Sequence, residues 1–292
     1  MTAHTDTPSP LHRNAFEREV FAYYHTKRDD ALNLDLGHVD GFYHHHFAVG
    51  DFDRSILALD GYARERAIGA EIHRMETRQV DTIIQALGNV SPQARLLDAG
   101  SGRGGTAFLL HHAFRCQIDG VNFSSYQNQF ARAQADKHGC ADRVHFHDRN
   151  MIGTGFPDAH FDYVVTNETT MYADLDEAFA EFSRLLKPGG RYVLLSWCRN
   201  DALAPHSDEA TAIDAHYRQT HRRDEYLRAL LQAGLIPYQV DDLTCRATPY
   251  WELRSQSALA TGVEASYLNG YRSDRVNYIR IAARKSLSDA GS

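Results

Sequence analysis

The sequence predicts an α/β protein built on a Rossmann-like, doubly wound and mostly parallel sheet. From residue 94 onward, short apolar runs alternate with amphipathic stretches of helical length, which is the pattern of strands joined by helical crossovers. The first apolar run also leads directly into a glycine-rich turn. Seven runs are expected as strands: residues 94–100, 116–122, 143–148, 161–168, 191–198, 237–243 and 275–285. The helices expected between them cover residues 104–114, 124–139, 175–190 and 222–234.

The sequence upstream of the sheet has a different character. Residues 1–14 are polar and rich in Pro, Ser and Thr, and are expected to be disordered. Residues 15–90 are rich in helix formers and aromatics, and predict an N-terminal helical cap that forms part of the substrate region. The core is then expected over residues 91–285. Stretches near 200–220 and 250–270 read as insertions that shape a substrate pocket.

Composition narrows the function classes. The chain has 292 residues, of which 43% are hydrophobic, enough for one elaborated α/β domain. A net charge of −7 argues against nucleic acid as the main partner. No apolar run approaches the length of a membrane span, and the first residues lack the apolar stretch of a secretory signal. The four cysteines are scattered, as expected of reduced thiols in a cytoplasmic protein.

The glycine-rich turn predicts a cofactor site. The run LLDAGSGRGG places Asp98 before Gly100 and Gly102, which let the backbone approach a ligand closely at a helix N-terminus. NAD-binding folds use a similar turn, so the glycines alone decide little. Asp98 can meet the amino group of S-adenosylmethionine (SAM), and LLKPGG before the fifth strand is typical of class I SAM methyltransferases. The alternative is a degenerate domain with an empty site.

The second and third strands supply the other expected cofactor contacts. An acidic residue often ends the second strand, but here the stretch V-x-x-S-x-x-Q from Val121 to Gln127 resembles that of cyclopropane-fatty-acid, sterol and prenyl-diphosphate methyltransferases. Ser124 could equally be a plain helix cap. Further contacts are expected after the third strand, beside the adenine, and at the end of the fourth. The predicted cofactor residues on these strands are Asn122, Phe123, Gln127, Asn150, Met151 and Asn167.

The fourth strand ends in a candidate catalytic carboxylate. It runs FDYVVTNETTMY and lacks the N/D-P-P-Y/F motif of many N-methyltransferases. Glu168 instead stands where the SAM methyl group is expected. Methylating an alkene carbon produces a carbocation that must lose a proton, and Glu168 could stabilise the cation and accept the proton. The alternative is a solvated loop Glu, or one bound to a backbone amide. Tyr172 lies one turn further on.

Four segments of the chain resemble the geranyl diphosphate C-methyltransferase family: GHVDGFYHHHFAVG, NETTMYADL, HRRDEYLRA and TPYWELRSQSALATGVEASYLNGYR. The resemblance extends over nearly the whole chain after residue 15. The resemblance implies a SAM-binding core with a helical cap, Mg²⁺ on the diphosphate, the strand-four Glu as base, an aromatic cavity that holds the cation, and a homo-oligomer. In the matching segments the predicted substrate residues are Tyr43, His44, His45, His46, Phe47, Tyr250 and Trp251, with Tyr217 as a catalytic aromatic.

Three positions depart from the pattern of that family. Phe47 stands where a Tyr is expected, Tyr217 where a Phe is expected, and Glu209 where an indole would form a wall. The most probable substrate on this resemblance is geranyl diphosphate. Isopentenyl and farnesyl diphosphate stay open, as do another carbon of geranyl diphosphate and a sterol- or acyl-type acceptor. A SAM-binding protein without turnover is the non-enzymatic alternative.

A metal site is also predicted, on weaker grounds. Adjacent His44, His45 and His46 point in different directions on an extended loop, so they are poor joint ligands, and diphosphate hydrogen bonds or loop packing suit them better. Mg²⁺ prefers oxygen ligands, which favours Glu71 and Glu76, acting directly or through water. These two lie five residues apart on a predicted helix, only loosely on one face, so a solvated helix surface is the alternative.

Overall fold

A computed structural model describes residues 11–26, 31–201, 220–258 and 260–287. Tyr217 and Glu209, most of the predicted 200–220 insertion and the first ten residues of the predicted disordered N-terminus lie outside this part of the chain. None of the described helices is long and apolar enough to cross a membrane.

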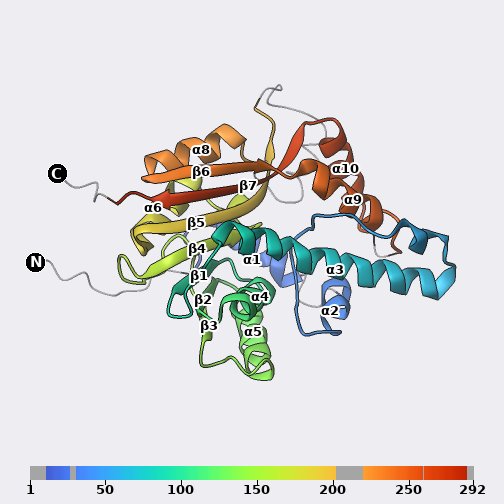
Figure 1. Ribbon diagram of the computed structural model, residues 1–292, viewed down its shortest axis with the longest axis horizontal. Helices are drawn as coiled ribbons and strands as arrows, with labels where there is room; N and C mark the ends of the chain where they lie inside the picture. Colours follow the sequence, from blue (N-terminus) through green and yellow to red (C-terminus); the bar gives the residue numbers. More distant parts are fainter. Residues whose placement is uncertain (1–10, 27–30, 202–219, 259, 288–292) are drawn as a thin grey trace, which may run out of the picture.

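The predicted sheet is confirmed. Its seven strands lie in the order β3-β2-β1-β4-β5-β7-β6, and all neighbours are parallel except β7, which runs antiparallel to both β5 and β6 (Figure 1). The strands are β1 (Arg95–Ala99), β2 (Gln117–Asn122), β3 (Val144–Asp148), β4 (Phe161–Asn167), β5 (Leu186–Arg199), β6 (Leu235–Asp242) and β7 (Val276–Lys285).

Helices cover both faces of the sheet and enclose two apolar cores. One core is formed with α3 (Gly61–Leu87), α4 (Gly105–Phe114), α5 (Ser125–Lys137), α9 (Thr244–Arg254) and α10 (Glu264–Arg272). The other is formed with α6 (Leu175–Leu185) and α8 (Arg223–Gln232). The remaining elements are α1 (Ala15–Thr26), α2 (Ala31–Gly37) and two short 3₁₀ helices, η1 (Arg54–Ala58) and η2 (Thr170–Tyr172).

Helix α3 and the 244–272 segment lie on the same side of the sheet. The 27-residue α3 packs against α4, α9 and β5, so the predicted cap shares a core with the sheet (Figure 1). Helices α9 and α10 occupy the second predicted insertion, between β6 and β7. The division into a cap at 15–90 and a core at 91–285 stays a prediction.

One predicted boundary is wrong. The sequence predicted a helix to residue 190, but α6 ends at Leu185 and β5 begins at Leu186. Pro188 cannot continue a helix, because its ring removes a donor and clashes with the preceding turn. Gly189 follows at φ 75°, a conformation that glycine adopts without strain. The register with β4 shifts at this point, so the KPGG turn is absorbed into the strand as an irregularity.

Candidate active site

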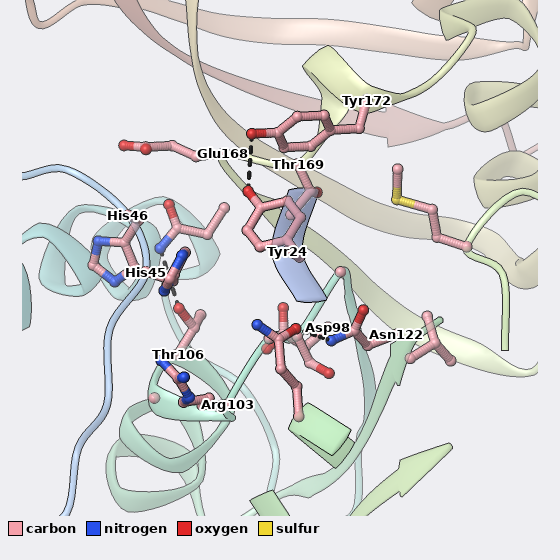
Figure 2. A pocket seen from close by; sticks show the side chains of 18 of the residues that line it. Tyr24, His45, His46, Asp98, Arg103, Thr106, Asn122, Glu168, Thr169 and Tyr172 are labelled. Atoms are coloured by element: carbon pink, nitrogen blue, oxygen red, sulfur yellow. Dashed lines mark hydrogen bonds between the residues drawn. The ribbon is translucent and has the colours of Figure 1, made fainter. Parts of the chain in front are cut away.

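A cavity opens at the carboxyl ends of the central strands, where the strand order reverses between β1 and β4. It holds about 840 Å³ of space, part of it open to solvent. Figure 2 shows that its walls come from the β1 and β4 ends, the α4 turn, α1 and the loop before α3. The lining residues predicted from the sequence are Tyr43, His44, His45, His46, Asp98, Gly100, Gly102, Asn122, Phe123, Gln127, Met151, Asn167, Glu168 and Tyr172.

The glycine turn lets the backbone form one wall. Gly100 and Gly102 have φ of 87° and 53°, a region that side chains disfavour. A Cβ atom on Gly100 would lie 2.4 Å from the Thr169 Cγ2 atom, and one on Gly105 would lie 2.6 Å from the Tyr43 carbonyl. The turn therefore leaves the N-terminus of α4 facing the cavity, where its amides favour an anionic group.

Asp98 brings a buried carboxylate to the same wall. The residue is 1% exposed, and its Oδ2 atom has no hydrogen-bond partner among the described residues. Burial raises its pKa to about 7, because the charged form is poorly solvated there. A buried acceptor without a donor fits a cationic ligand group such as the SAM amino group.

At the end of strand two the helix-cap interpretation is confirmed, and the cofactor contact stays a prediction. Asn122 Nδ2 donates to Gln127 Oε1 over 2.7 Å at the cavity wall, and Ser124 caps α5 by accepting from the Gln127 amide over 3.4 Å. These polar groups and the Phe123 ring leave the second-strand wall without a carboxylate. Amide groups can hydrogen-bond ribose hydroxyls without adding a charge beside Asp98.

Asn150 is not brought to the cavity, in contrast to Met151. Its Nδ2 atom donates to Glu17 Oε2 over 2.8 Å and to the Leu11 carbonyl over 3.2 Å. It therefore holds α1, and its contact with adenine stays a prediction. Because α1 contributes Val20 and Tyr24 to the cavity wall, Asn150 holds a helix that forms part of that wall.

This contact leads to a testable prediction about ligand release. Asn150→Ala should speed dissociation of SAM or its product by roughly 10-fold, because a hydrogen bond to a charged group that holds α1 is lost. Stopped-flow displacement measures the rate, with the exposed Arg18→Ala on the same helix as control. Glu17→Gln should act in the same direction. A faster release in Asn150→Ala alone would instead favour the adenine contact.

Glu168 occupies the position expected of the base. It is 7% exposed, lines the cavity and follows directly on β4 with φ 54°, a strained conformation for a residue with a side chain. Both carboxylate oxygens accept from the Phe47 amide over 3.0 Å, and Oε1 also accepts from the Tyr278 hydroxyl over 2.6 Å. Burial raises its pKa to about 8, and these hydrogen bonds oppose that rise.

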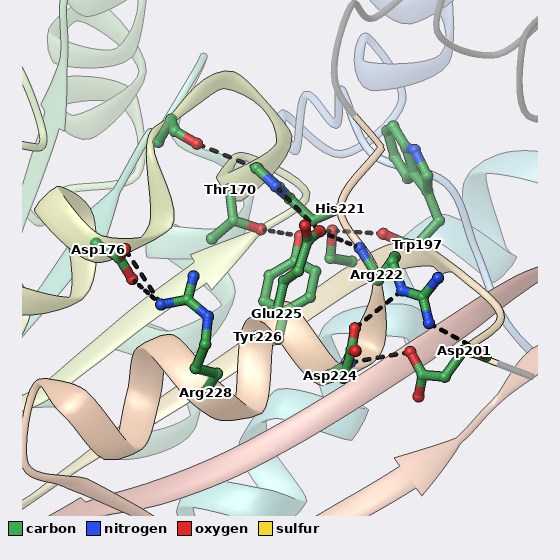
Figure 3. A network of polar contacts seen from close by, with 12 residues as sticks. Thr170, Asp176, Trp197, Asp201, His221, Arg222, Asp224, Glu225, Tyr226 and Arg228 are labelled. Atoms are coloured by element: carbon green, nitrogen blue, oxygen red, sulfur yellow. Dashed lines mark hydrogen bonds and ion pairs between the residues drawn. The ribbon is translucent and has the colours of Figure 1, made fainter. Parts of the chain in front are cut away.

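The turn after Glu168 is held from behind by α8 (Figure 3). The Tyr226 hydroxyl bonds Thr170 over 2.8 Å and Ser196 over 2.9 Å, and His221 Nε2 lies 3.2 Å from the Ala173 carbonyl. On the cavity side the Tyr24 hydroxyl donates to the Tyr172 hydroxyl over 2.8 Å (Figure 2). Glu168 and Tyr172 therefore stand on a turn that is fixed from both sides.

Residues 97–194 match the family model for a methyltransferase domain. The geranyl diphosphate 2-C-methyltransferase of Saccharopolyspora erythraea is 42% identical over 94% of this chain and 98% of its own length. That of Streptomyces lasalocidi is 39% identical over 97% and 94%. The chain belongs to the geranyl diphosphate C-methyltransferase family.

A solved structure of that family agrees. Geranyl diphosphate C-methyltransferase from Streptomyces coelicolor, in complex with Mg²⁺, geranyl-S-thiolodiphosphate and S-adenosyl-L-homocysteine, superimposes with a TM-score of 0.90 at 36% identity. The match covers 95% of this chain and 100% of that one. The SAM-dependent methyltransferase activity and fold predicted from the sequence are thereby confirmed.

In this methyltransferase the histidine loop is packed as well as cavity-lining. His44 Nε2 lies 3.1 Å from Thr77 Oγ1, and His46 Nδ1 donates to the Phe47 carbonyl over 2.8 Å. Burial lowers the pKa of both rings, that of His46 to about 4. The loop-packing interpretation of these residues is seen, and a contact with diphosphate stays a prediction.

Three predicted substrate aromatics do not line the described cavity. They form a cluster of aromatic rings instead, made up of Phe47, Tyr250, Trp251 and neighbouring rings. The ring centroids of Phe47 and Trp251 lie 4.4 Å apart, and Trp251 stacks on Tyr267 with a centroid distance of 4.3 Å. Large aromatic rings bury more apolar area against one another than against an open cavity, which explains the packing.

Glu71 and Glu76 each have protein partners of their own. Glu71 is paired with Arg74 and accepts from the Asp53 amide, and the buried Glu76 accepts from the Tyr250 hydroxyl over 2.8 Å. Across the described ranges, no group of three or more His, Cys, Asp or Glu residues could hold a metal ion. The predicted role of Glu71 and Glu76 near Mg²⁺ stays a prediction.

Sequence reasoning missed several residues of the site, and four of them matter for its chemistry. Tyr24 and Arg103 line the cavity, and Gln79 and Tyr278 lie behind Asn167 and Glu168. The Arg103 guanidinium is 1% exposed and lies 5.7 Å from the centre of the Phe130 ring. Its signal in the sequence was the position of a permanently charged arginine inside the glycine-rich turn. Tyr278 and Gln79 gave no signal, since each reads as an ordinary core position of a strand or a helix.

Proposed function

We propose that this chain transfers the methyl group of SAM to C2 of geranyl diphosphate, with Mg²⁺ accompanying the diphosphate. The substrate and the carbon are those in the names of its relatives. The observation that carries the proposal is the Glu168 carboxylate, which is buried, held by two donors and exposed to the same cavity as Asp98 and the glycine turn.

The reaction needs an acceptor for one proton. SAM supplies an electrophilic methyl group, and its C–S bond breaks as the π electrons of the substrate C2=C3 bond form the new C–C bond. C3 is left as a tertiary cation. Loss of the C2 proton to a base returns an electron pair to the C2=C3 bond and gives 2-methylgeranyl diphosphate. Glu168 takes that proton, and its negative charge stabilises the cation before the transfer.

Different walls of the cavity contact different groups of the cofactor. Asp98 pairs with the amino group, while the α4 N-terminus and Arg103 face the carboxylate. Asn122 and Gln127 contact the ribose hydroxyls, and Met151 packs against the adenine. Tyr172 presents its ring to the developing cation. Tyr217, which lies outside the described residues, is assigned the same role on the family resemblance alone.

Mg²⁺ enters with the substrate in this proposal. The diphosphate oxygens and water supply most of the oxygen ligands that the ion prefers. We also propose, on the family resemblance, that the chain is a cytoplasmic homo-oligomer. Sedimentation of the purified protein measures its oligomeric state.

A substrate panel tests the proposed function. The enzyme is incubated with SAM, Mg²⁺ and isopentenyl, dimethylallyl, geranyl or farnesyl diphosphate, and products are read by mass. Geranyl diphosphate should gain one methyl group, and nuclear magnetic resonance should place it on C2. Preferential turnover of a shorter or longer diphosphate would overturn the assigned chain length. Turnover of a sterol or an acyl acceptor without Mg²⁺ would overturn the substrate class.

A further inference from the structure

Behind the cavity, a chain of four polar side chains ends on Glu168. Gln79 Nε2 donates to Asn167 Oδ1 over 2.6 Å, and Asn167 Nδ2 donates back to Gln79 Oε1 over 3.0 Å. Gln79 Nε2 also donates to the Tyr278 hydroxyl over 2.8 Å, and that hydroxyl donates to Glu168 Oε1 over 2.6 Å. The chain links α3, β4 and β7, and Gln79 and Tyr278 are fully buried.

The direction of the hydrogen bonds in this chain is fixed. The carboxylate of ionised Glu168 can only accept, so the Tyr278 hydroxyl donates its single proton to Oε1 over 2.6 Å. The Tyr278 oxygen is then left to accept, which fits the Gln79 Nε2 donor 2.8 Å away. Gln79 and Asn167 pair through both of their amide groups, and Thr106 Oγ1 lies 3.1 Å from Asn167 Nδ2, so both side chains are held in place.

This arrangement gives the two oxygens of Glu168 different numbers of hydrogen bonds. Oε1 receives the Tyr278 hydroxyl and shares the Phe47 amide, whereas Oε2 has only its share of that amide. The less occupied oxygen keeps an open lone pair for a proton, on a residue that lines the cavity. A buried hydrogen bond to a charged acceptor also favours the ionised form, which is the form that a base requires.

We propose that Tyr278, oriented by Gln79, is the positioning residue that favours the ionised form of Glu168 and turns one of its oxygens toward the substrate. The inference deepens the proposed function and rests on it, because Glu168 is the base there. Neither Tyr278 nor Gln79 lines the described cavity. Both therefore act through Glu168 and have no contact with the substrate.

Other groups near Glu168 affect its charge and stay in place when Tyr278 is changed. Glu76 opposes ionisation of Glu168, and Glu76 itself accepts from the Tyr250 hydroxyl, which Arg254 contacts over 3.2 Å. The titratable or charged side chains around the site are Tyr24 from α1, His46 from the loop, Glu76 from α3, Tyr172 from η2, Tyr250 and Arg254 from α9, and Tyr271 from α10.

The test is the titration of Glu168 in Tyr278→Phe. Infrared difference spectra against Glu168→Gln report its carboxyl group in the enzyme without substrate. The midpoint should rise by about 1–2 pH units, as expected for the loss of one hydrogen bond to a charged acceptor. The acid limb of the kcat profile on geranyl diphosphate should move in the same direction. Gln79→Met should produce a smaller shift of the same sign, since the hydroxyl can then turn away.

A matched variant separates positioning from packing. Tyr192 is also fully buried and bonds Thr166 over 2.7 Å, in the core on the other face of the sheet. Tyr192→Phe should lower the melting temperature without moving the Glu168 midpoint. An unmoved midpoint in folded Tyr278→Phe and Gln79→Met would overturn the inference. Inactivity of the wild type on geranyl diphosphate would overturn the proposed function, and the titration would still decide the role of Tyr278.

Discussion

Glu168→Gln should bind SAM nearly as well as the wild type and lose turnover by about 100-fold or more. Gln preserves the shape of the side chain, and its oxygen can still accept from Phe47 and Tyr278. It removes the charge that stabilises the cation and the basic oxygen that accepts the proton. The loss should therefore appear in kcat, while calorimetry of SAM binding changes little.

The pH profile gives the same assignment a second test. Because the pKa of Glu168 is raised to about 8 in the free enzyme, kcat/KM should rise with pH through that region. At saturating SAM, this rise in rate should occur at lower pH, since the positive sulfonium of SAM favours the ionised carboxylate. Glu181→Gln serves as the control, because that carboxylate holds Thr154 outside the cavity. Near-wild-type turnover in Glu168→Gln would leave Tyr172 or the substrate diphosphate as the base.

The position of Glu168 at the cavity was predictable from the sequence because it depends on local order along the chain. The end of the fourth strand faces the cofactor in any fold of this topology, so a carboxylate there could be placed without coordinates. Its partners could not be predicted. Phe47 and Tyr278 lie 121 and 110 residues away in the sequence, and nothing in a single chain without an alignment marks a contact at that separation.

Asn150 and the aromatic residues show a different limit of prediction from the sequence, which concerns the direction in which a side chain points. The loop after the third strand does lie beside the cavity, as Met151 shows, but the orientation of one side chain depends on what else packs there. Asn150 turns to Glu17 because α1 buries a carboxylate beside it. For Trp251, the family resemblance of the TPYWELR segment and the aromatic ring predicted a cavity wall, whereas the ring stacks on Tyr267 in the core.

Two carboxylates therefore stand in one cavity with raised pKa values, Asp98 at about 7 and Glu168 at about 8. Each makes the ionised, ligand-free state less stable, because burial removes hydration from the charge. SAM carries two positive charges, on its amino group and its sulfonium. The charges of the cofactor and the cavity are thus complementary, and part of the SAM affinity comes from relieving the cost of two buried anions.

Asp98→Asn should consequently weaken SAM binding and stabilise the ligand-free enzyme. Loss of a buried, charge-assisted pair with the amino group corresponds to roughly 2–3 kcal/mol, or about 30- to 150-fold in Kd. Asn is nearly isosteric and carries no charge, so it avoids the cost of burying a carboxylate. Gly100→Val is a harsher change at the same wall, because its Cβ atom would meet Thr169 at 2.4 Å and φ is 87°. It should abolish SAM binding and also lower the melting temperature.

The sign of the pH dependence separates the two effects of Asp98→Asn. The folded pKa of about 7 lies above the ordinary value of 3.8, so the folded state holds its proton more tightly than the unfolded state. The Asp98 contribution to stability therefore falls as pH rises from about 4 to 7 and stays low above that. The melting temperature of Asp98→Asn should exceed that of the wild type at pH 8 and approach it at pH 4. SAM should reverse the order at pH 8. Normal SAM affinity in Asp98→Asn by calorimetry would show that the amino group is bound elsewhere.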